Sequence, residues 1–412
     1  MSDRNSRPAE KMGRVAPRFL ATAIAALFAG SEVLALPVGP QVVNGSASIA
    51  QVGNALTINN SAGAILNWQK FSIGADELVR FNQPSAASSV LNRVLAADPS
   101  VIYGQLSSNG KVFLINPAGI LVGAGARIDT AGFVASTLGL SNSDFLAGKL
   151  NFKADGSAGS VINQGEISTP LGGNIYLIGS QVTNQGLITT PQGETILAAG
   201  ATVSLIDTAT PGVKVDITGA EGNVTNLGQI TAEAGRIGMA GVLVRNSGQL
   251  NASSVVNQGG RIFLKASQDT YVDQGGRMLT TGTTGGSVEI LGNRVALTDQ
   301  AQVDASGEQG GGQILVGGDY QGKNANIQNA QVTYVGKDTQ LKASATHTGA
   351  GGKVIVWSDD TTRAYGNIEA KGGTNAGNGG FIETSGKRYL DVAGIKVDTR
   401  AADGSAGWWL LD

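Results

Sequence analysis

A short motif that recurs about every 21 residues limits the folds open to this chain more than any other feature. The motif reads Val-x-Asn-x-Gly-x-Ile, with Leu last in its final copy, and its asparagines are Asn163, Asn184, Asn226 and Asn246. Their spacings of 21, 42 and 20 residues are interpreted as one, two and one periods. A unit of this length cannot bury its own apolar face, so consecutive units are expected to stack on one another.

A second motif, Gly-Gly-x-[Ile/Val], precedes short runs that alternate apolar and polar residues. Its copies begin at Gly172, Gly259, Gly285, Gly311, Gly351 and Gly379. Runs of this kind, bounded by Gly and Asn, predict strands. Glycines at the corners are expected to supply positive φ angles. The later spacings of this motif widen from 26 to 40 and 28 residues, which predicts longer loops in the later coils.

Together the two motifs predict an all-β fold, a parallel β-helix in which each coil lies on the previous one. Coils would stack about 4.8 Å apart, so about 17 coils would make a rod roughly 80 Å long. The repeated asparagines would stack as an amide ladder. A sandwich would show turn signals about every 8–12 residues and a propeller repeats of about 40–50, and neither fits well. The segment nearest to a helix, Ser143 to Lys149, is expected to be a loop.

The composition excludes several functional classes. A net charge of −2 with dispersed basic residues argues against nucleic acid or an anionic membrane as a partner. The chain has no Cys, so it forms neither disulfides nor thiolate metal sites. No cofactor is predicted, because the single His347 is expected in a loop and the Gly-rich stretches lack the ending of a phosphate-binding loop.

Residues 1–35 are predicted to be a signal peptide. Five basic residues precede an apolar run from Phe19 to Ala29, which is too short to span a bilayer. The tripeptide that ends at Ala35 fits the small-residue cleavage rule and predicts a mature chain that starts at Leu36. No later segment reaches membrane-spanning length, so no integral membrane segment is predicted in the mature chain.

Residues 36–150 contain less of the repeat and more distinctive sequence. The informative blocks span residues 36–49, 65–74, 81–85, 91–94, 102–106, 109–120 and 133–138. In these blocks the chain closely resembles the secretion domain of two-partner-secreted exoproteins, also called the filamentous haemagglutinin N-terminal or haemagglutination activity domain. The resemblance covers about 100 residues specifically and the repeat region more loosely.

The resemblance implies a right-handed parallel β-helix with an N-terminal capping and secretion module. It also implies export from a Gram-negative cell, first into the periplasm and then through an outer-membrane β-barrel transporter whose periplasmic domains recognise the N-terminal domain. We therefore expect a secreted or cell-surface adhesin whose receptor lies on a host cell or another cell surface, with a glycan among the candidates. The expected division is signal peptide 1–35, secretion domain 36–150 and β-helix rod 151–412.

The family's Asn-Pro-Asn-Gly-Ile motif falls on residues 116–120, and its third position is Ala here. Proline fixes φ, the residue before it favours extended backbone and glycine permits a bend, so the motif has the chemistry of a turn. These residues are expected mainly to shape the fold, with transporter recognition carried by the surrounding surface. The candidate secretion-motif and recognition residues are Asn67, Asn92, Arg93, Asn116, Pro117, Ala118, Gly119 and Ile120.

Two other functions compete with adhesion, namely the stalk of a contact-dependent growth inhibition toxin without its toxic domain and a β-helix polysaccharide lyase or hydrolase. Such an enzyme needs carboxylates that converge on a groove. The acidic pair Asp359–Asp360 follows a predicted strand and is expected to be a solvated turn, so no enzyme is predicted. The terminal segment from Gly407, with Trp408 and Trp409, either caps the last coil or leads into further chain.

Overall fold

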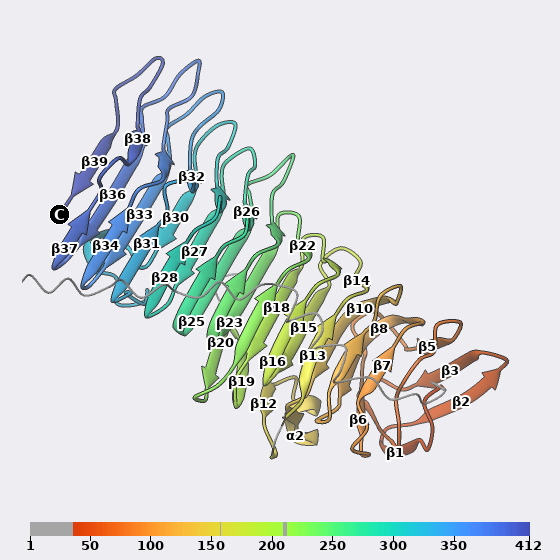
Figure 1. Cartoon of the computed structure of the whole chain (residues 1–412). Helices are drawn as coiled ribbons and strands as arrows, with labels where there is room; N and C mark the ends of the chain where they lie inside the picture. The colour runs from red at the N-terminus through yellow and green to blue at the C-terminus, as the bar shows by residue number, and fades with distance from the viewer. Residues whose placement is uncertain (1–35, 157, 209–211) are drawn as a thin grey trace, which may run out of the picture. The chain divides into compact units, whose positions relative to one another are not determined.

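The computed structural model describes residues 36–412, apart from residue 157 and residues 209–211. The predicted signal peptide, with Ala35, lies outside the described residues. From residue 36 the chain winds into a right-handed parallel β-helix with its coils stacked in sequence order (Figure 1). Each complete coil contributes a strand to each of three parallel sheets, which we call the Asn sheet, the middle sheet and the Gly-Gly sheet.

The Asn sheet holds the repeated asparagines and their equivalents. Its strands are β7 (Ser100–Ile102), β9 (Ile120–Val122), β13 (Ser160–Asn163), β16 (Gln181–Asn184), β21 (Asn223–Asn226), the ends of β23 (Arg236–Asn246) and β25 (Arg261–Val272), β28 (Arg294–Leu297), β31 (Val332–Val335), β34 (Thr361–Ala364) and β37 (Tyr389–Asp391). In this sheet the strand of each coil pairs in parallel with the strand of the next coil.

The middle sheet follows the Asn sheet in each coil. Its strands are β3 (Ala55–Asn60), β5 (Leu78–Asn82), the starts of β8 (Gln105–Ile115) and β10 (Arg127–Ser136), β14 (Glu166–Ser168), β17 (Leu187–Thr189), β22 (Gln229–Thr231), β24 (Gln249–Asn251), β26 (Arg277–Leu279), β29 (Gln302–Asp304), β32 (Gln340–Lys342), β35 (Asn367–Glu369) and β38 (Lys396–Asp398). These thirteen strands give the number of coils in the described chain.

The Gly-Gly sheet completes each coil. Its strands are β4 (Ala64–Trp68), β6 (Ser89–Val94), the ends of β8 and β10, β15 (Asn174–Gly179), β18 (Glu194–Ala199), the starts of β23 and β25, β27 (Ser287–Leu291), β30 (Gln313–Val316), β33 (Lys353–Ser358), β36 (Phe381–Gly386) and β39 (Trp408–Leu411). The two tryptophans therefore belong to a strand, in which Trp409 lies beside Ile382 of the preceding coil.

Thirteen coils are fewer than the 17 expected, because many coils are longer than the 21-residue period. The 42-residue step between Asn184 and Asn226, interpreted above as two periods, is a single coil. Strand β16 pairs directly with β21 and places these two asparagines side by side. The additional residues leave the coil as a hairpin formed by β19 (Thr202–Thr208) and β20 (Gly212–Thr218).

The three corners of a coil accept different lengths of chain. Two residues separate β13 from β14 at the corner between the Asn and middle sheets. At the next corner, residues 343–352 join β32 to β33, so the prediction of longer loops in the later coils is confirmed. The corner between the Gly-Gly and Asn sheets carries three excursions, residues 137–159, 200–222 and 317–331.

One apolar core runs through the interior of the coils. In the middle sheet, Ile128, Ile167, Ile188 and Ile230 stack in register from coil to coil, and each is at most 1% exposed. Burying one such side chain contributes roughly 1.5–3 kcal/mol. Because the row repeats along the stack, each coil buries its apolar face against its two neighbours.

The repeated asparagines form a buried row beside this core. Nδ2 of Asn163 donates to Oδ1 of Asn184, and the same hydrogen bond links Asn184 to Asn226 and Asn226 to Asn246, each at 2.8 Å. All four residues are 0% exposed. Oδ1 of Asn163 also accepts the backbone N–H of Gly165 at 3.1 Å. The amides therefore link consecutive coils, and the first of them also closes the turn that follows it.

The glycines of both motifs allow consecutive coils to approach closely. A Cβ at Gly312 would overlap the carbonyl oxygen of Gly286, and one at Gly228 would overlap that of Gly186. Neither Gly312 nor Gly228 has a positive φ. The expectation of positive φ at the corners is therefore wrong for these positions, because the constraint there is the spacing between coils rather than a backbone dihedral angle.

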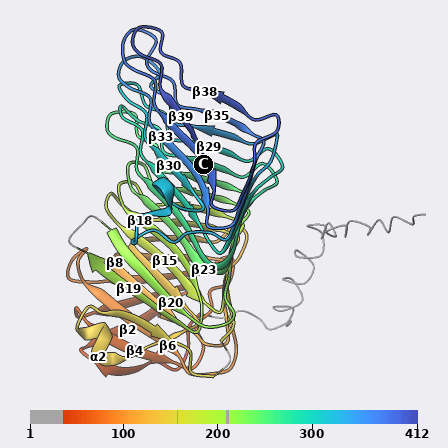
Figure 2. The ribbon, with the colours of Figure 1, turned by 90° about the vertical axis from the view of Figure 1, so that its left-hand side faces the viewer.

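A second, antiparallel sheet covers the outer side of the Gly-Gly sheet in the early coils (Figure 2). It consists of β11 (Gly139–Leu140), β12 (Leu150–Lys153), β19 and β20. Outward side chains such as Leu91 and Phe113 pack with Phe152 and Val203 in a second apolar cluster. A short helix, α2 (Asn142–Leu146), lies where a loop was expected, and the hydroxyl of Ser141 caps it.

The first coil has its own cover. Strand β2 (Ala47–Val52) forms an antiparallel hairpin with β3, and β1 (Gln41–Asn44) pairs antiparallel with β4. The partly buried Ile49 packs against the end of the main core. The described structure therefore has a distinct N-terminal cap, as the resemblance implied.

The amide row leads to a stability prediction. Asn226→Ala removes the partner of two neighbouring buried amides, so we expect it to lower the free energy of unfolding by about 1–3 kcal/mol. Asn223→Ala, at an exposed position of the same strand, is the matched control and should change stability by less than about 0.5 kcal/mol. Urea unfolding followed by circular dichroism measures both, and equal midpoints for the two variants would contradict the prediction.

Candidate functional site

The predicted secretion motif forms a tight turn between β8 and β9. Asn116 is 0% exposed, and its Nδ2 donates to the carbonyl oxygen of Asp98 and to Oγ of Ser100, both at 3.0 Å. Its Oδ1 accepts the backbone N–H of Ala118 at 3.0 Å. Gly119 has a φ of 134°, which a residue with a side chain rarely adopts. Asn116 thus holds the turn together from inside the coil.

The middle of the motif faces outward. Pro117 is exposed and Ala118 half-buried, whereas Ile120 points into the core. The carbonyl oxygen of Pro117 accepts the backbone N–H of Gly159 on the following coil at 2.7 Å. Only Pro117 and, in part, Ala118 are therefore available to a partner once the coil has formed.

Asn92 belongs to β6 of the Gly-Gly sheet, and its side chain faces the interior of the β-helix. Its Oδ1 accepts the indole N–H of Trp68 at 2.9 Å, and its Nδ2 donates to the carbonyl oxygen of Phe113 at 3.2 Å. Asn92 and Trp68 are both 0% exposed. This pair fixes the packing of three consecutive coils around the indole ring, and no partner can reach it in the folded chain.

Arg93 lies on the opposite, outer side of the same strand. Its guanidinium donates to the carbonyl oxygen of Leu140 and to Oδ1 of Asn142, both at 2.9 Å, and reaches Oδ1 of Asn67 at 3.4 Å. Burial lowers the pKa of Arg93 from its ordinary value. Arg93 therefore fastens the segment that carries α2 to the early coils, and it is half-buried in doing so.

The structure brings these predicted residues to one end of the early Gly-Gly strands, but it divides them between two sides. Asn67, Arg93 and Ile115 are neighbours on adjacent strands, and Asn116 follows directly. Sequence reasoning missed Ser100 and Asn142, the partners of Asn116 and Arg93. The cap signal Ser-x-x-Asp at residues 141–144 points to the helix that positions Asn142, whereas nothing in the sequence marks Ser100. The part that the predicted secretion-motif residues play in transporter recognition stays a prediction.

The remaining candidate chemistry is scattered. His347 is exposed in a loop and contacts the side chain of Asn375 at 3.3 Å. Oδ1 of Asp359 accepts from the indole of Trp357 and from Asn329, both at 3.2 Å, in the turn between β33 and β34. Among the described residues, no group of three His, Cys, Asp or Glu side chains is placed to hold a metal ion.

Glu383 is a buried carboxylate that sequence reasoning missed. It is 0% exposed, and its two oxygens accept the backbone N–H of Gln321 at 3.2 Å. Gln321 belongs to the excursion 317–331, which includes the short 3-10 helix η1 (Tyr320–Gly322) and covers this part of the Gly-Gly sheet. Burial raises the pKa of Glu383. The carboxylate anchors the excursion and opens onto no groove, so its arrangement is structural.

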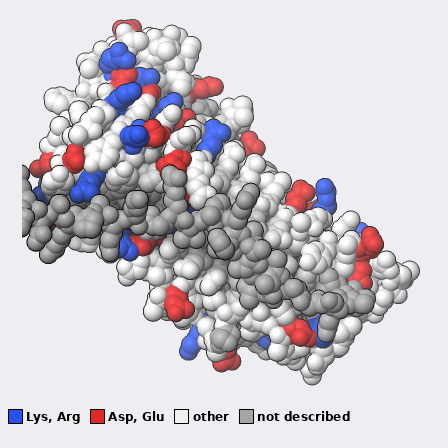
Figure 3. Space-filling view, viewed as in Figure 1, with Lys and Arg blue, Asp and Glu red and all other residues white. Residues whose placement is uncertain are grey.

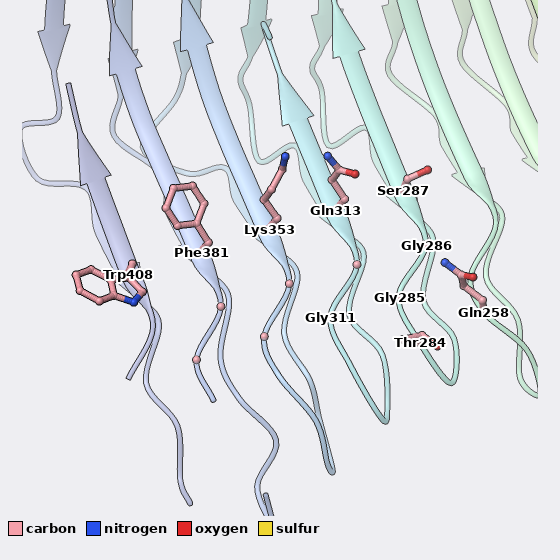
Figure 4. A pocket seen from close by; sticks show the side chains of 15 residues that line it. Gln258, Thr284, Gly285, Gly286, Ser287, Gly311, Gln313, Lys353, Phe381 and Trp408 are labelled. Atoms are coloured by element: carbon pink, nitrogen blue, oxygen red, sulfur yellow. The ribbon is translucent and has the colours of Figure 1, made fainter. Parts of the chain in front are cut away.

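A shallow groove follows the Gly-Gly corner of the later coils (Figure 4). Glycine backbone forms its floor, and its rim carries one row of residues from successive strands. This row is Ser287, Gln313, Lys353, Phe381 and Trp408. Of the described residues that line the groove, none is Asp or Glu, so it lacks the paired carboxylates that a glycosidase needs.

Charges of both signs are interspersed on the face seen in Figure 3, with uncharged stretches between them. Several charged residues in the described part of the chain form pairs between neighbouring strands, such as Arg294 with Asp269 at 2.6 Å and Arg236 with Glu194 at 2.8 Å. No helix in the described part of the chain is long and apolar enough to cross a membrane. The face seen in Figure 3 shows no single-sign patch of the kind that attracts a polyanion.

Comparison with known proteins gives three findings. A family model described as TPS secretion domain matches residues 35–290. Two proteins described as heme/hemopexin-binding protein, both from Haemophilus influenzae, are 42% identical over 103 and 74 residues, which are 25% and 18% of this chain. These segments are only 11% and 8% of the two relatives. The solved HMW1 secretion domain from Haemophilus influenzae is 36% identical with a TM-score of 0.83, covering 91% of this chain and 100% of that one.

The turn at residues 116–120 gives a testable contrast. Asn116→Ala leaves the buried acceptors of the turn without their donor, so we expect a loss of about 1–3 kcal/mol in stability. Pro117→Ala changes an exposed residue without a backbone donor and should cost less than about 1 kcal/mol. Thermal unfolding compares the two variants, and a larger loss for Pro117→Ala would show that the amide does not hold the turn.

The buried Glu383 predicts a pH dependence. A raised folded-state pKa means that this group stabilises the fold fully below the ordinary value of 4.5 and loses that contribution as pH rises through the folded-state pKa. We therefore expect Glu383→Gln to unfold with a shallower decline in stability above this value than the unmodified chain. Chemical unfolding at a series of pH values tests this, and parallel profiles for the two proteins would refute it.

Proposed function

The chain belongs to the family of TPS secretion domains, and on that premise we propose that its N-terminal coils direct export through a cognate outer-membrane β-barrel transporter. Proteins of this family are secreted across the outer membrane to the cell surface. The single observation that carries the proposal is the match to the HMW1 secretion domain, which extends over 91% of this chain at 36% identity.

The geometry of the early coils suggests how the secretion motif contributes. Asn92 and Asn116 are both 0% exposed in the folded chain, so their side chains cannot contact a transporter there. We assign to them the task of building the early coils, around which the exposed Pro117 and the neighbouring surface are available for recognition. The division of the chain at residue 150 stays a prediction, and β10 pairs with β14 and β15 across it.

Folding is expected to follow transport. A finished stack of coils is wider than a single strand and would not thread a narrow pore, so the chain would cross unfolded and form its coils outside. The absence of Cys fits this route, because no disulfide can lock the chain during its passage through the oxidising periplasm. Charged residues are few and both signs are interspersed, so like charges on neighbouring coils repel one another little when the coils stack outside the cell.

The coils beyond the secretion motif are proposed to serve adhesion by presenting their outer strands to a receptor on another surface. The relatives are described as a heme/hemopexin-binding protein and a secretion domain, neither of which is an enzyme description. Because the aligned segment is 11% of the heme/hemopexin-binding protein, its binding activity is not transferred to this chain. The toxin-stalk and lyase alternatives lack a specific supporting feature in the described residues.

Export gives the direct test. Expressed with a cognate outer-membrane transporter, the chain should accumulate outside the cell with Leu36 at its N-terminus, and without the transporter it should remain in the periplasm. Asn116→Ala should reduce the exported amount, whereas the matched surface variant Asn223→Ala should not. Immunoblots of medium and periplasm measure the distribution. Equal export with and without the transporter would overturn the proposal.

A further inference from the structure

Exposed and half-buried tyrosines and arginines gather on the outer side of the Asn sheet in the later coils, over β25, β28, β31, β34 and β37. We call this surface the tyrosine face and define it by Tyr271, Arg294, Tyr334, Arg363, Tyr365 and Tyr389. Tyr334 is 36% exposed and Tyr389 is 49% exposed. Tyr271 and Tyr334 stand in one row, two coils apart, with the small Ala296 between them.

The side chains of the tyrosine face are held in place by one another. The rings of Tyr334 and Tyr365 meet edge to face with their centres 5.9 Å apart, and the hydroxyl of Tyr365 donates to Asp391 at 2.7 Å. The guanidinium of Arg363 stacks on the ring of Tyr389 at 5.9 Å. Because these side chains are ordered before a ligand arrives, binding loses less conformational entropy.

The charges of the tyrosine face are balanced. Arg294 forms two hydrogen bonds with the carboxylate of Asp269, both at 2.6 Å, and Arg245 at the edge of the face pairs with Asp273 at 2.9 Å. In each pair the guanidinium is the more exposed partner and the carboxylate is mostly buried, so the pair presents hydrogen-bond donors at the surface while its charge is neutralised. A ligand with strong charge of either sign gains little here, whereas a neutral ligand rich in hydroxyl groups finds guanidinium donors and the exposed hydroxyl groups of Tyr334 and Tyr389.

The size of the tyrosine face distinguishes between kinds of occupant. Five strands at the inter-strand spacing extend about 20 Å along the stack, and the outward part of each strand is about 10 Å wide. A stable protein interface buries about 800 Å² on each partner, well above the roughly 200 Å² of this rectangle. An added peptide strand needs an unpaired sheet edge, which β28, β31 and β34 lack because each is paired on both sides. Strand β37 pairs only with β34, but a peptide added at its edge would extend the Asn sheet rather than cover the tyrosine face.

We propose that the tyrosine face binds a short linear neutral oligosaccharide that lies along the stack of coils. Sugar rings have an apolar C–H face and a rim of hydroxyl groups. The C–H face packs on the electron-rich faces of Tyr334 and Tyr389, and the hydroxyl groups bond to the Arg294–Asp269 pair. Arg363 stacks on one face of Tyr389, and Tyr389 as a whole remains 49% exposed. The inference rests on the proposed adhesive function and names the class of ligand.

The test is binding of the purified full chain to an array of linear neutral hexasaccharides (cello-, malto- and chitohexaose), with sialylated and uronate-containing chains printed beside them. We expect at least one neutral chain to bind with little change between low and high salt. The double substitution Tyr334→Ala and Tyr389→Ala should weaken that binding about ten-fold or more, which corresponds to about 1.4 kcal/mol.

Two matched variants keep the result interpretable. The pair Tyr334→Phe and Tyr389→Phe keeps both rings and should retain binding. Tyr320→Ala removes a tyrosine of similar exposure, 44%, from the 3-10 helix η1, which lies outside the tyrosine face, and should bind as the unmodified chain does. Unchanged circular dichroism for the alanine pair, expected because both side chains point outward, assigns any loss to the face itself.

The inference is overturned if no neutral chain binds, if the alanine pair binds undiminished, or if only acidic chains bind with steep salt dependence. Adhesion of transporter-expressing cells, measured separately, reports on the proposed function. If the cells adhere but no neutral chain binds on the array, the oligosaccharide proposal is refuted and the proposed adhesive function is retained. Failure of export would remove the proposed secretion route without altering the result on the array.

Discussion

Backbone hydrogen bonds between coils hold consecutive strands about 4.8 Å apart, and every other feature of this molecule has to fit that spacing. At the corners the backbones pass so close together that a Cβ at Gly312 would strike the carbonyl oxygen of the coil before it. In the interior, the same spacing places identical residues of consecutive coils against one another, so Ile167 packs on Ile128 and Asn184 on Asn163. The asparagine row is tolerated in the interior because the neighbouring amides of the same row complete one another's hydrogen bonds.

The period of the motifs was enough to predict strands, stacking and the parallel arrangement, because each is a local consequence of where Asn and Gly recur. It was not enough to count the coils. A spacing of 42 residues between Asn184 and Asn226 is compatible with two short coils or with one coil that carries a hairpin. The structure has one coil, because a hairpin that leaves the stack adds length without adding a coil. The second apolar cluster was also hidden, because Phe152 and Val203 come from separate excursions that meet only in the folded chain.

The secretion motif shows a similar limit. Its turn chemistry could be predicted from Pro117 and Gly119 alone, since proline and glycine restrict the backbone whatever surrounds them. The inward orientation of Asn92 depends on the strand register. The attachment of Arg93 to Leu140 and Asn142 depends on how the helix that follows Ser141 docks on the early coils, which its cap signal does not reveal. Resemblance located these residues in the sequence, but only the folded structure separates those that build the coil from those that remain accessible.

The corner between the Gly-Gly and Asn sheets has a consequence for how such a chain changes length. Three excursions leave the stack there, whereas in other coils the same junction is very short, as between β15 and β16, which are separated by a single residue. An added segment at this corner does not shift the rows above or below it, because the strands on either side keep their partners. Foreign sequence, whether acquired by recombination or grafted as an epitope, can therefore enter between β27 and β28 and be displayed on the side of the rod without resetting its architecture.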